Sequence, residues 1–295
     1  MANLKALGVY SVVTQVRDEM VPVKGHETRV KSLMAAFEKT GVRTLAIPSI
    51  SASNELIQRE RPDIIISDSP RCQTLAAQSF NVLIYDDTSL ALYYKQAGMY
   101  LFPSGGMSPF SPEVPAFSGI VVNSFLEERH RGIWSFPENR KILVIERGPS
   151  EAFWDAVHFV VREARDIGAD VEIIRRDQPI AHGLLINKML SSTLVITTAS
   201  TTAKEAAFLG CPTVIVKTAP GQSHIYNHLI HNGLARSEFE YGTARGAING
   251  AITPSRAGRA TLITNQEVVN IILNEREKWL VSGGERTYVG HRFRC

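Results

Sequence analysis

The expected fold is decided by residues Thr197–Asn227, TTASTTAKEAAFLGCPTVIVKTAPGQSHIYN. The apolar run at 193–196 leads into this stretch and predicts a buried strand. A loop of small residues follows, a helix is predicted to begin near Thr202, and Gly210 opens the Gly-Cys-Pro sequence that ends it. A second strand is predicted at 213–216. The sequence therefore predicts a strand–loop–helix–strand unit in which a helix N-terminus faces the loop.

The N-terminus of this helix is suited to a phosphate group. Its first backbone N–H groups have no partner within the helix, and the helix dipole gives them a partial positive charge. Glu205 is predicted in the first turn, where a carboxylate can accept hydrogen bonds from a ribose diol; the dipole alone also favours an acid there. Gln222 and Asn227 follow the second strand in a polar loop. The segment has the parts needed to hold a nucleotide.

The order of these features resembles the nucleotide-sugar-binding half of GT-B glycosyltransferases. The nearest likenesses are the undecaprenyl-muramoyl-peptide N-acetylglucosaminyltransferases and the UDP-sugar hydrolases of pseudaminic acid synthesis. The resemblance implies an α/β chain with two Rossmann-like domains facing across a cleft and mostly parallel sheets. One departure is Ala199, which stands where the family usually has Gly; since Ala tolerates positive φ poorly, a differently shaped loop is expected.

The same resemblance implies roles for several residues. The ribose hydroxyls are assigned to Glu205, and the polar contacts near the sugar to Gln222 and Asn227. The diphosphate is assigned to the loop and helix start, which comprise Ser200, Thr201 and Thr202.

The N-terminal half carries a second, weaker likeness. The sequence Lys24-Gly25-His26-Glu27-Thr28-Arg29 precedes an amphipathic helical pattern that Gly41 closes. It is similar to the Gly-His-x-x-Arg motif of the hydrolases, whose His takes part in proton transfer. The resemblance implies that His26 is the catalytic base and that Gly25 and Arg29 help to bind the nucleotide sugar. The bland alternative is a solvated or structural histidine in a loop before the helix.

Carboxylates follow two predicted strands of this half. Asp68 comes after the run at 64–66, and Asp86 and Asp87 come after the run at 82–85. Ligands of open α/β sheets bind at the carboxyl ends of the strands, so these three residues are further candidates for the catalytic base. Asp is also common in loops and caps. Asp87 is alternatively the cap of a helix predicted over 88–97.

Two more sets of polar residues keep more than one interpretation. Ser150, after Gly148 and Pro149, stands where the family has its diphosphate loop, so the resemblance implies a phosphate contact; a plain N-cap is the alternative. The histidines at 224, 228 and 231 share one helix face, but no Cys or carboxylate completes a zinc site. Neither a cofactor nor a divalent metal is required by the expected chemistry, although the pair Asp86-Asp87 keeps a metal open.

Length and composition indicate a globular chain of two domains. The 295 residues are 44% hydrophobic and 21% charged, with no apolar run long enough for a membrane helix. We expect an acceptor domain at 1–125, a linker at 126–140, a nucleotide-sugar domain at 141–264, and a final helix and basic tail at 265–295. The Pro-, Gly- and Ser-rich segment 101–118 is predicted to be a loop. Three widely spaced Cys favour a cytoplasmic setting.

Several functions fit these patterns. The leading one is a glycosyltransferase that uses a nucleotide sugar, most simply UDP-linked, and displaces the nucleotide at the anomeric carbon. The acceptor is open: water would make the chain a UDP-sugar hydrolase, and a small molecule or glycan an ordinary transferase. A hydroxymethylated DNA base is a third acceptor, favoured slightly by basic residues near 245–259 and in the tail; the net charge of +3 is mild and is weak evidence for nucleic acid. A nucleotide-binding protein without catalysis is the remaining class.

Overall fold

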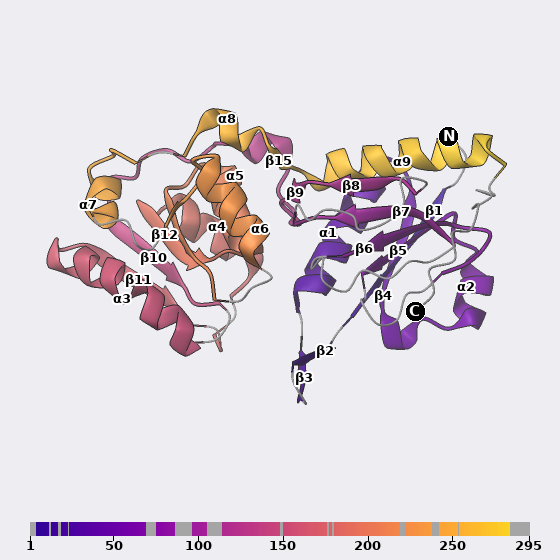
Figure 1. Cartoon of the computed structure of the whole chain (residues 1–295), viewed down its shortest axis with the longest axis horizontal. Helices are drawn as coiled ribbons and strands as arrows, with labels where there is room; N and C mark the ends of the chain where they lie inside the picture. Colours follow the sequence, from indigo (N-terminus) through magenta and orange to yellow (C-terminus); the bar gives the residue numbers. More distant parts are fainter. Residues whose placement is uncertain are drawn as a thin grey trace, which may run out of the picture. The chain divides into compact units, whose positions relative to one another are not determined.

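The computed structural model describes residues 4–11, 13–16, 19–22, 24–68, 75–85, 96–104, 114–147, 150–175, 177–178, 180–218, 222–237, 242–252 and 254–283. The chain forms two compact units (Figure 1). Unit 1 comprises residues 1–119, 123–125 and 265–295, and unit 2 comprises residues 120–122 and 126–264. Each unit is built around its own parallel sheet.

Unit 1 contains a six-stranded sheet in the order β4-β1-β5-β6-β7-β8, with every neighbouring pair parallel. Its strands are β1 (Lys5–Tyr10), β4 (Arg43–Pro48), β5 (Ile64–Asp68), β6 (Phe80–Ile84), β7 (Ala97–Phe102) and β8 (Ala116–Ser118). A short antiparallel pair, β2 (Val13–Val16) and β3 (Glu19–Pro22), precedes α1 (Lys24–Lys39). The turn η1 (Ser49–Ser51) and α2 (Asn54–Glu60) connect β4 to β5. Residues 64–68 are all buried, as expected for a central parallel strand covered on both faces.

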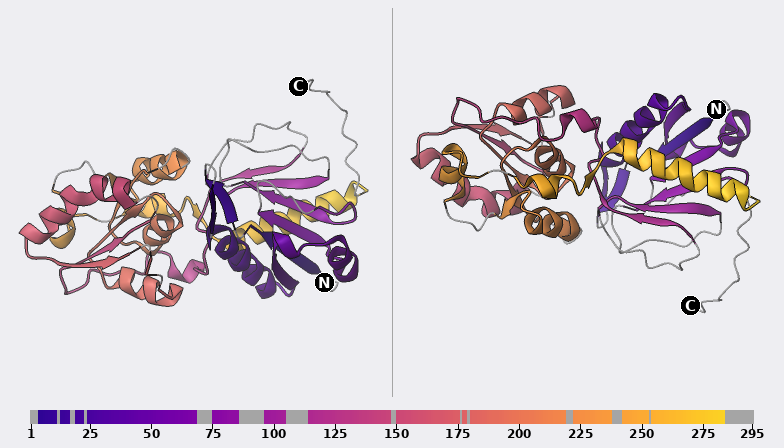
Figure 2. Two further views of the ribbon diagram at one scale, coloured as in Figure 1. Left: turned by 90° about the horizontal axis from the view of Figure 1, so that it is seen from below. Right: turned by 90° about the horizontal axis from the view of Figure 1, so that it is seen from above.

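Two helices of unit 1 pack against each other beside this sheet. Helix α1 lies so close to β1 that a Cβ added at Gly8 would stand 2.5 Å from Val30 Cγ1. Helix α9 (Asn265–Val281), yellow in Figures 1 and 2, runs along the sheet next to α1. It begins at Asn265, whose Nδ2 donates to Ser32 Oγ at 2.8 Å and to the carbonyl oxygen of Ser124 at 3.0 Å. The C-terminal helix is therefore a structural part of unit 1.

Unit 2 contains a five-stranded parallel sheet in the order β11-β10-β12-β13-β14. Its strands are β10 (Lys141–Ile145), β11 (Asp170–Ile174), β12 (Leu194–Thr198), β13 (Thr213–Val216) and β14 (Arg236–Ser237). Its helices are α3 (Ser150–Asp166), α4 (His182–Leu190), α5 (Thr201–Leu209), α6 (Ser223–His231), α7 (Thr243–Ile248) and α8 (Arg256–Arg259). The turn η3 (Glu128–His130) and a parallel pair of β9 (Ile120–Val121) with β15 (Leu262–Ile263) complete the unit.

Alternate residues of the unit 2 strands fill two separate cores. Leu143, Val195 and Ile215 pack with residues of α4, α5 and α6, whereas Val144 and Val214 pack with residues of α3 and α7. This alternation follows from the two-residue period of a strand. The result is a layer of helices on each face of the sheet (Figure 1).

Three sequence predictions differ from this structure. The expected linker at 126–140 is counted in unit 2, where the amides of Gly132 and Trp134 donate to the carbonyl oxygens of Phe208 and Leu209 at 2.8 and 2.9 Å. The segment 101–118 is not wholly a loop, since β7 extends to Phe102 and β8 occupies its end. The helix predicted over 88–97 is wrong at Ala97, which begins β7, and residues 86–95 lie outside the described part of the chain.

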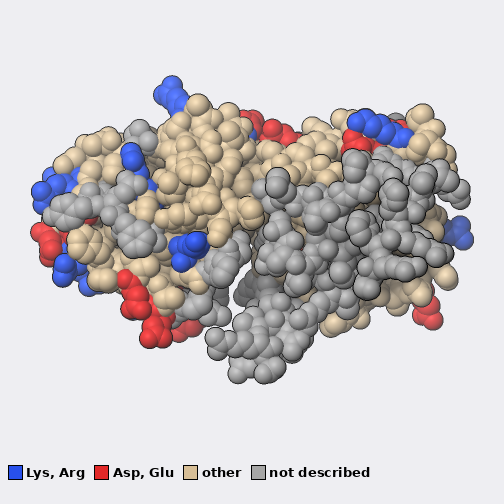
Figure 3. All heavy atoms as spheres, in the orientation of Figure 1, with Lys and Arg blue, Asp and Glu red and all other residues tan. Residues whose placement is uncertain are grey.

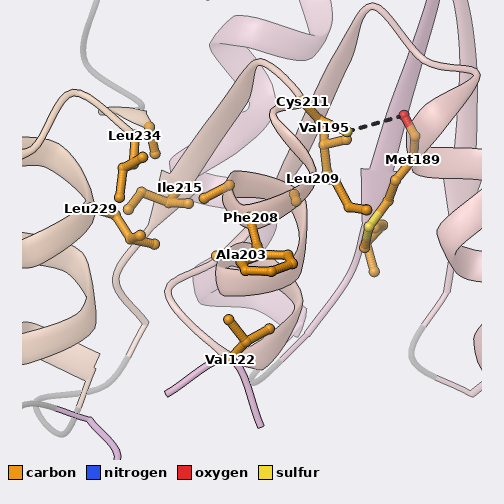
Figure 4. Packing of buried hydrophobic residues seen from close by; sticks show 14 of the residues in the cluster. Val122, Met189, Val195, Ala203, Phe208, Leu209, Cys211, Ile215, Leu229 and Leu234 are labelled. Carbon is orange, nitrogen blue, oxygen red and sulfur yellow. Dashed lines mark hydrogen bonds between the residues drawn. The ribbon is translucent and has the colours of Figure 1, made fainter. Parts of the chain in front are cut away.

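Substitution of Phe208 tests the packing of the larger core of unit 2. It is fully buried on α5 between Ala203, Leu209 and Val122 in the view of Figure 4. We expect Phe208→Ala to lower the free energy of unfolding by about 3–5 kcal/mol, because it removes buried surface and leaves a cavity. Chemical denaturation measures this. The control is Phe159→Ala on the exposed side of α3, which should cost about 0.5 kcal/mol; equal effects of the two variants would contradict this packing.

Candidate functional site

The strand order of each sheet marks a place where ligands bind in open α/β folds. In unit 2 the chain passes from β10 to β11 on one side and then to β12 on the other side of β10. In unit 1 it passes from β1 to β4 and then to β5 in the same way. The carboxyl ends of two such strands diverge into connections on opposite faces, which opens a crevice between them. The start of α5 in unit 2 and the residues His26 and Asp68 in unit 1 lie at these two switch points.

The connection from β12 to α5 in unit 2 leaves three hydroxyl groups without a partner. Thr197 and Thr198 are the last residues of β12 and are 0% exposed, and Ser200 is the N-cap residue of α5. The Oγ atoms of all three are buried and have no hydrogen-bond partner among the described residues. A buried hydroxyl that stays unpaired costs about 1–3 kcal/mol. Ser200 directly precedes the N–H groups of the helix start that have no partner within the helix, and an anion bound there would satisfy them together with its hydroxyl.

Ala199 adopts an ordinary backbone conformation in this connection. The only non-Gly residues with positive φ in the described part of the chain are Arg61 and Asn123. Ser200 is extended, with φ −141° and ψ −172°, so α5 begins directly after it at Thr201. The connection therefore takes its shape without a Gly at position 199.

Glu205 is not in the first turn of α5, as the sequence suggested, but is the fifth residue of the helix. It is only 3% exposed, and its Oε1 lies 2.7 Å from Nε2 of His182. His182 is the first residue of α4, and its side chain is 34% exposed. The Glu205 hydrogen bond raises the pKa of His182 more than its burial lowers it. Helix α4 thus supplies a hydrogen-bond partner for Glu205, the residue predicted to bind the ribose.

A half-buried arginine adds positive charge to the same edge. Arg147 stands two residues after β10, and its guanidinium donates to the carbonyl oxygen of Glu146 at 3.1 Å. Burial lowers the pKa of Arg147, while the charge of Glu205 acts in the opposite direction. A guanidinium placed here is suited to an anionic group.

The remaining sequence-predicted residues of unit 2 are arranged less compactly. Gln222 is the N-cap residue of α6, and its Oε1 accepts from the backbone N–H of Thr218 at 2.7 Å. Asn227 is exposed on α6. Thr201 and Thr202 are the first two residues of α5, and Ser150 begins α3. The side chain of Ser150 lies outside the described residues.

The switch point of unit 1 brings His26, Asp68 and Arg29 together. The Nδ1 of His26 lies 2.8 Å from Oδ1 of Asp68, and Nη1 of Arg29 lies 3.5 and 3.4 Å from the two Asp68 oxygens. Asp68 is 1% exposed at the end of β5, whereas the His26 side chain is 16% exposed. An ionised carboxylate only accepts hydrogen bonds, so His26 carries its proton on Nδ1 and presents the lone pair of Nε2. The sequence treated His26 and Asp68 as alternative bases; the structure makes them a pair.

Two details of this region correct the sequence analysis. His26 is in the first turn of α1 rather than in a loop before it, because the helix already begins at Lys24. Gly25 is exposed in the same turn, and a Cβ there would meet nothing within 4 Å. Asp86 and Asp87 lie outside the described residues.

Sequence reasoning missed His182 and Arg147. His182 precedes Glu205 by 23 residues and contacts it only because α4 packs beside α5. No local sequence pattern predicts this contact. Arg147 immediately precedes the Gly148-Pro149-Ser150 sequence. A charged residue close to the carboxyl end of a buried strand is a signal that could have identified it.

Within the described ranges, no group of three or more His, Cys, Asp or Glu side chains is placed to hold a metal ion. Of the three histidines on α6, His228 has its Nε2 2.8 Å from Oγ1 of Thr261, and burial lowers its pKa. The same ranges contain no helix with the length and apolar character needed to cross a bilayer.

Comparison with solved structures identifies the fold. The chain is similar to the glycosyltransferase SsfS6 of Streptomyces sp. SF2575, with 11% identity over 92% of this chain and 99% of that one and a TM-score of 0.50. It is also similar to Staphylococcus aureus MnaA bound to UDP (10% identity, 99% and 100% covered, TM-score 0.54). The UDP-GlcNAc 2-epimerase of Methanocaldococcus jannaschii has 10% identity, coverage of 92% and 100%, and a TM-score of 0.54.

These neighbours share the GT-B fold, and the chain has that fold, with two Rossmann-like units. The α/β class and the mostly parallel sheets expected from the sequence are confirmed. No family model and no curated protein matches the sequence. Structural similarity at about 10% sequence identity supports a shared fold but not a shared function. The function is therefore inferred from the site.

The His182–Glu205 pair makes a prediction about pH. Because the folded state raises the pKa of His182, the contribution of the pair to stability is fully present below the unfolded value of about 6.5 and is lost as pH rises through the folded-state value. His182→Ala should lower the free energy of unfolding by about 1 kcal/mol or less near pH 5.5 and by a smaller amount near pH 8.5, the scale of a partly exposed ion pair.

The matched control is His228→Ala, since burial lowers the pKa of His228 and its pH trend should be reversed. Denaturation curves at both pH values and an NMR titration of the histidines measure the effect. A cost of His182→Ala that is the same at both pH values, or a His182 pKa at its ordinary value, would contradict the pairing.

Proposed function

We propose that the chain is a nucleotide-sugar-dependent glycosyltransferase, with a UDP-sugar as donor, that displaces the nucleoside diphosphate at the anomeric carbon. The observation that carries the proposal is the connection from β12 to α5. Thr197, Thr198 and Ser200 have buried hydroxyls without a partner among the described residues. The first N–H groups of α5 have no partner within the helix, and the buried Glu205 follows one turn further on. An anion site followed by a carboxylate suits a diphosphate joined to a ribose.

In this proposal the diphosphate binds at the start of α5. The N–H groups of Thr201 and Thr202 and the orphan hydroxyls donate to its oxygens, and Arg147 supplies a full positive charge. These groups gain strength as negative charge develops on the departing diphosphate, which lowers the barrier of the displacement. The proposal assigns this neutralisation to the chain's own residues and needs neither a cofactor nor a divalent cation.

The base is assigned to unit 1. The Nε2 of His26 takes the proton from an acceptor hydroxyl as its oxygen bonds to the anomeric carbon, and the bond from that carbon to the diphosphate breaks with its electron pair. Asp68 holds the proton-bearing Nδ1 at 2.8 Å and stabilises the imidazolium that forms. Arg29 places a positive charge beside the buried Asp68 carboxylate, with Nη1 3.4 Å from Oδ2.

The acceptor is left open by the described residues. The same His26–Asp68 pair would activate water, which is the hydrolase alternative. The DNA alternative gains no support: Arg259 is used within unit 2, where its guanidinium donates to the carbonyl oxygen of Pro254. On the face shown in Figure 3, the described Lys and Arg side chains are scattered rather than gathered in one patch.

The test is to screen UDP-, GDP- and dTDP-sugars for stabilisation of the chain and then to assay nucleoside diphosphate release from the donors that bind. We expect a UDP-sugar to stabilise the chain and release to depend on an added sugar or small-molecule acceptor. Release at the same rate without an acceptor would identify the hydrolase instead. If no nucleotide sugar binds at millimolar concentration, the proposal is wrong.

Glu205→Ala should weaken UDP binding by about 1–3 kcal/mol, the scale of losing a charge-assisted hydrogen bond to the ribose. Isothermal titration calorimetry measures this. The control is Glu163→Ala, which removes a carboxylate on α3 that accepts from the N–H of Ala244 at 3.2 Å. Affinity left intact by Glu205→Ala would reject the ribose assignment.

His26→Gln and Asp68→Asn should each lower kcat by about 10²–10⁴, the range for loss of a general base or of its orientation, and should leave UDP affinity nearly unchanged. The measurement is the rate of nucleoside diphosphate release with the donor at saturation. His158→Gln, on the exposed side of α3, is the control for loss of a histidine. A fall of less than about fivefold, well below that range, would make His26 structural.

A further inference from the structure

Glu205 does not offer a whole carboxylate to a ligand. Its Oε1 is held by Nε2 of His182 at 2.7 Å, and the residue is only 3% exposed. Its other oxygen, Oε2, has no hydrogen-bond partner in the described part of the chain and is not fully buried. A carboxylate has acceptor sites on both oxygens, so a ribose diol can donate one hydroxyl to each. Here Oε1 already accepts a hydrogen bond from His182, and a ribose hydroxyl would have to share that oxygen.

We propose that His182 is a specificity-determining residue, which leaves Glu205 a single oxygen for the nucleoside and lets the site take 2′-deoxyribonucleoside diphosphates about as well as ribonucleoside diphosphates. The inference rests on the proposed nucleotide site and names the class of nucleotide that it accepts. One sugar hydroxyl donates to Oε2 in either case. The second hydroxyl of a ribonucleotide has to share Oε1 with His182, which weakens its hydrogen bond.

A ribose hydroxyl that displaced His182 from Oε1 of Glu205 would gain little binding free energy, because one hydrogen bond would replace another. The bond between His182 and Glu205 joins an imidazole nitrogen to a carboxylate and is charge-assisted when the imidazole is protonated. A second ribose hydroxyl that replaced it would form a bond to the same carboxylate oxygen, while His182 would lose its hydrogen bond to Glu205. The two bonds are of comparable strength, so the net preference for the ribose is small. The charge of Glu205 also acts on Arg147.

The experiment compares matched pairs of ligands on the intact chain. The dissociation constants of UDP and dUDP, GDP and dGDP, and ADP and dADP are measured by calorimetry near pH 6.5. For the pair that binds more tightly, we expect the ribonucleotide and deoxyribonucleotide constants to differ by less than about threefold, under 0.7 kcal/mol at 1.4 kcal/mol per tenfold. A preference of about tenfold or more for the ribonucleotide, as expected from one additional hydrogen bond to a charged group, would overturn the inference.

Variants at position 182 test the cause. His182→Ala frees Oε1 and should raise the preference for the ribonucleotide by about fivefold or more. His182→Gln retains an N–H donor that can reach Glu205 and should keep the ratio close to that of the wild type. His228→Ala, which removes another half-buried histidine of unit 2, should also leave the ratio unchanged. A His182→Ala ratio equal to the wild-type ratio would overturn the role of His182. If that variant does not fold, the wild-type comparison decides alone.

The result separates this inference from the function on which it rests. If no nucleoside diphosphate of either kind binds, the proposed function fails and the inference fails with it. If UDP binds and turnover occurs but dUDP is rejected, the proposed function stands and the assignment of His182 is wrong.

Discussion

The reversal of strand order beside the first strand of each sheet is the constraint on which both candidate sites depend. In unit 2 it lies between β10 and β12, and in unit 1 between β1 and β5. Because all paired strands of these two sheets run parallel, their carboxyl ends share an edge, and the connections leave to opposite faces at the reversal. The path of the backbone therefore places the start of α5 at the carboxyl edge of the unit 2 sheet. In the same way it places His26 and Asp68 at the carboxyl edge of the unit 1 sheet.

The two sites differ in what they leave unsatisfied. At the start of α5, backbone N–H groups and three orphan hydroxyls are all possible donors, so the missing partner is an acceptor such as a phosphate. At the end of β5, the carboxylate of Asp68 is held between an imidazole and a guanidinium, so the group that remains available is the outer nitrogen of His26. One site is therefore suited to binding an anion and the other to accepting a proton, which is the division of labour that the proposed transfer needs.

Much of the fold could be predicted from the sequence because its elements are marked by local patterns. The strand at 213–216 has the predicted bounds, and the final helix begins at the predicted residue 265. The errors have local causes as well. The Pro, Gly and Ser residues of 101–118 hid the strand character of β7 and β8, which lie on either side of the segment 105–113, outside the described residues. The predicted linker at 126–140 has no periodic pattern, although its backbone hydrogen-bonds to the end of α5. The site was harder, since His182 meets Glu205 and His26 meets Asp68 only through packing across 23 and 42 residues. The roles of these residues stay predictions.

The central claim is that the nucleoside diphosphate binds at the switch point of unit 2. The most direct measurement is a crystal structure of the chain with UDP. The account predicts diphosphate oxygens within hydrogen-bond distance of the backbone N–H groups of Thr201 and Thr202, with the ribose on the free oxygen of Glu205 and His182 still in place. UDP bound elsewhere on the chain, with the start of α5 vacant, would contradict it.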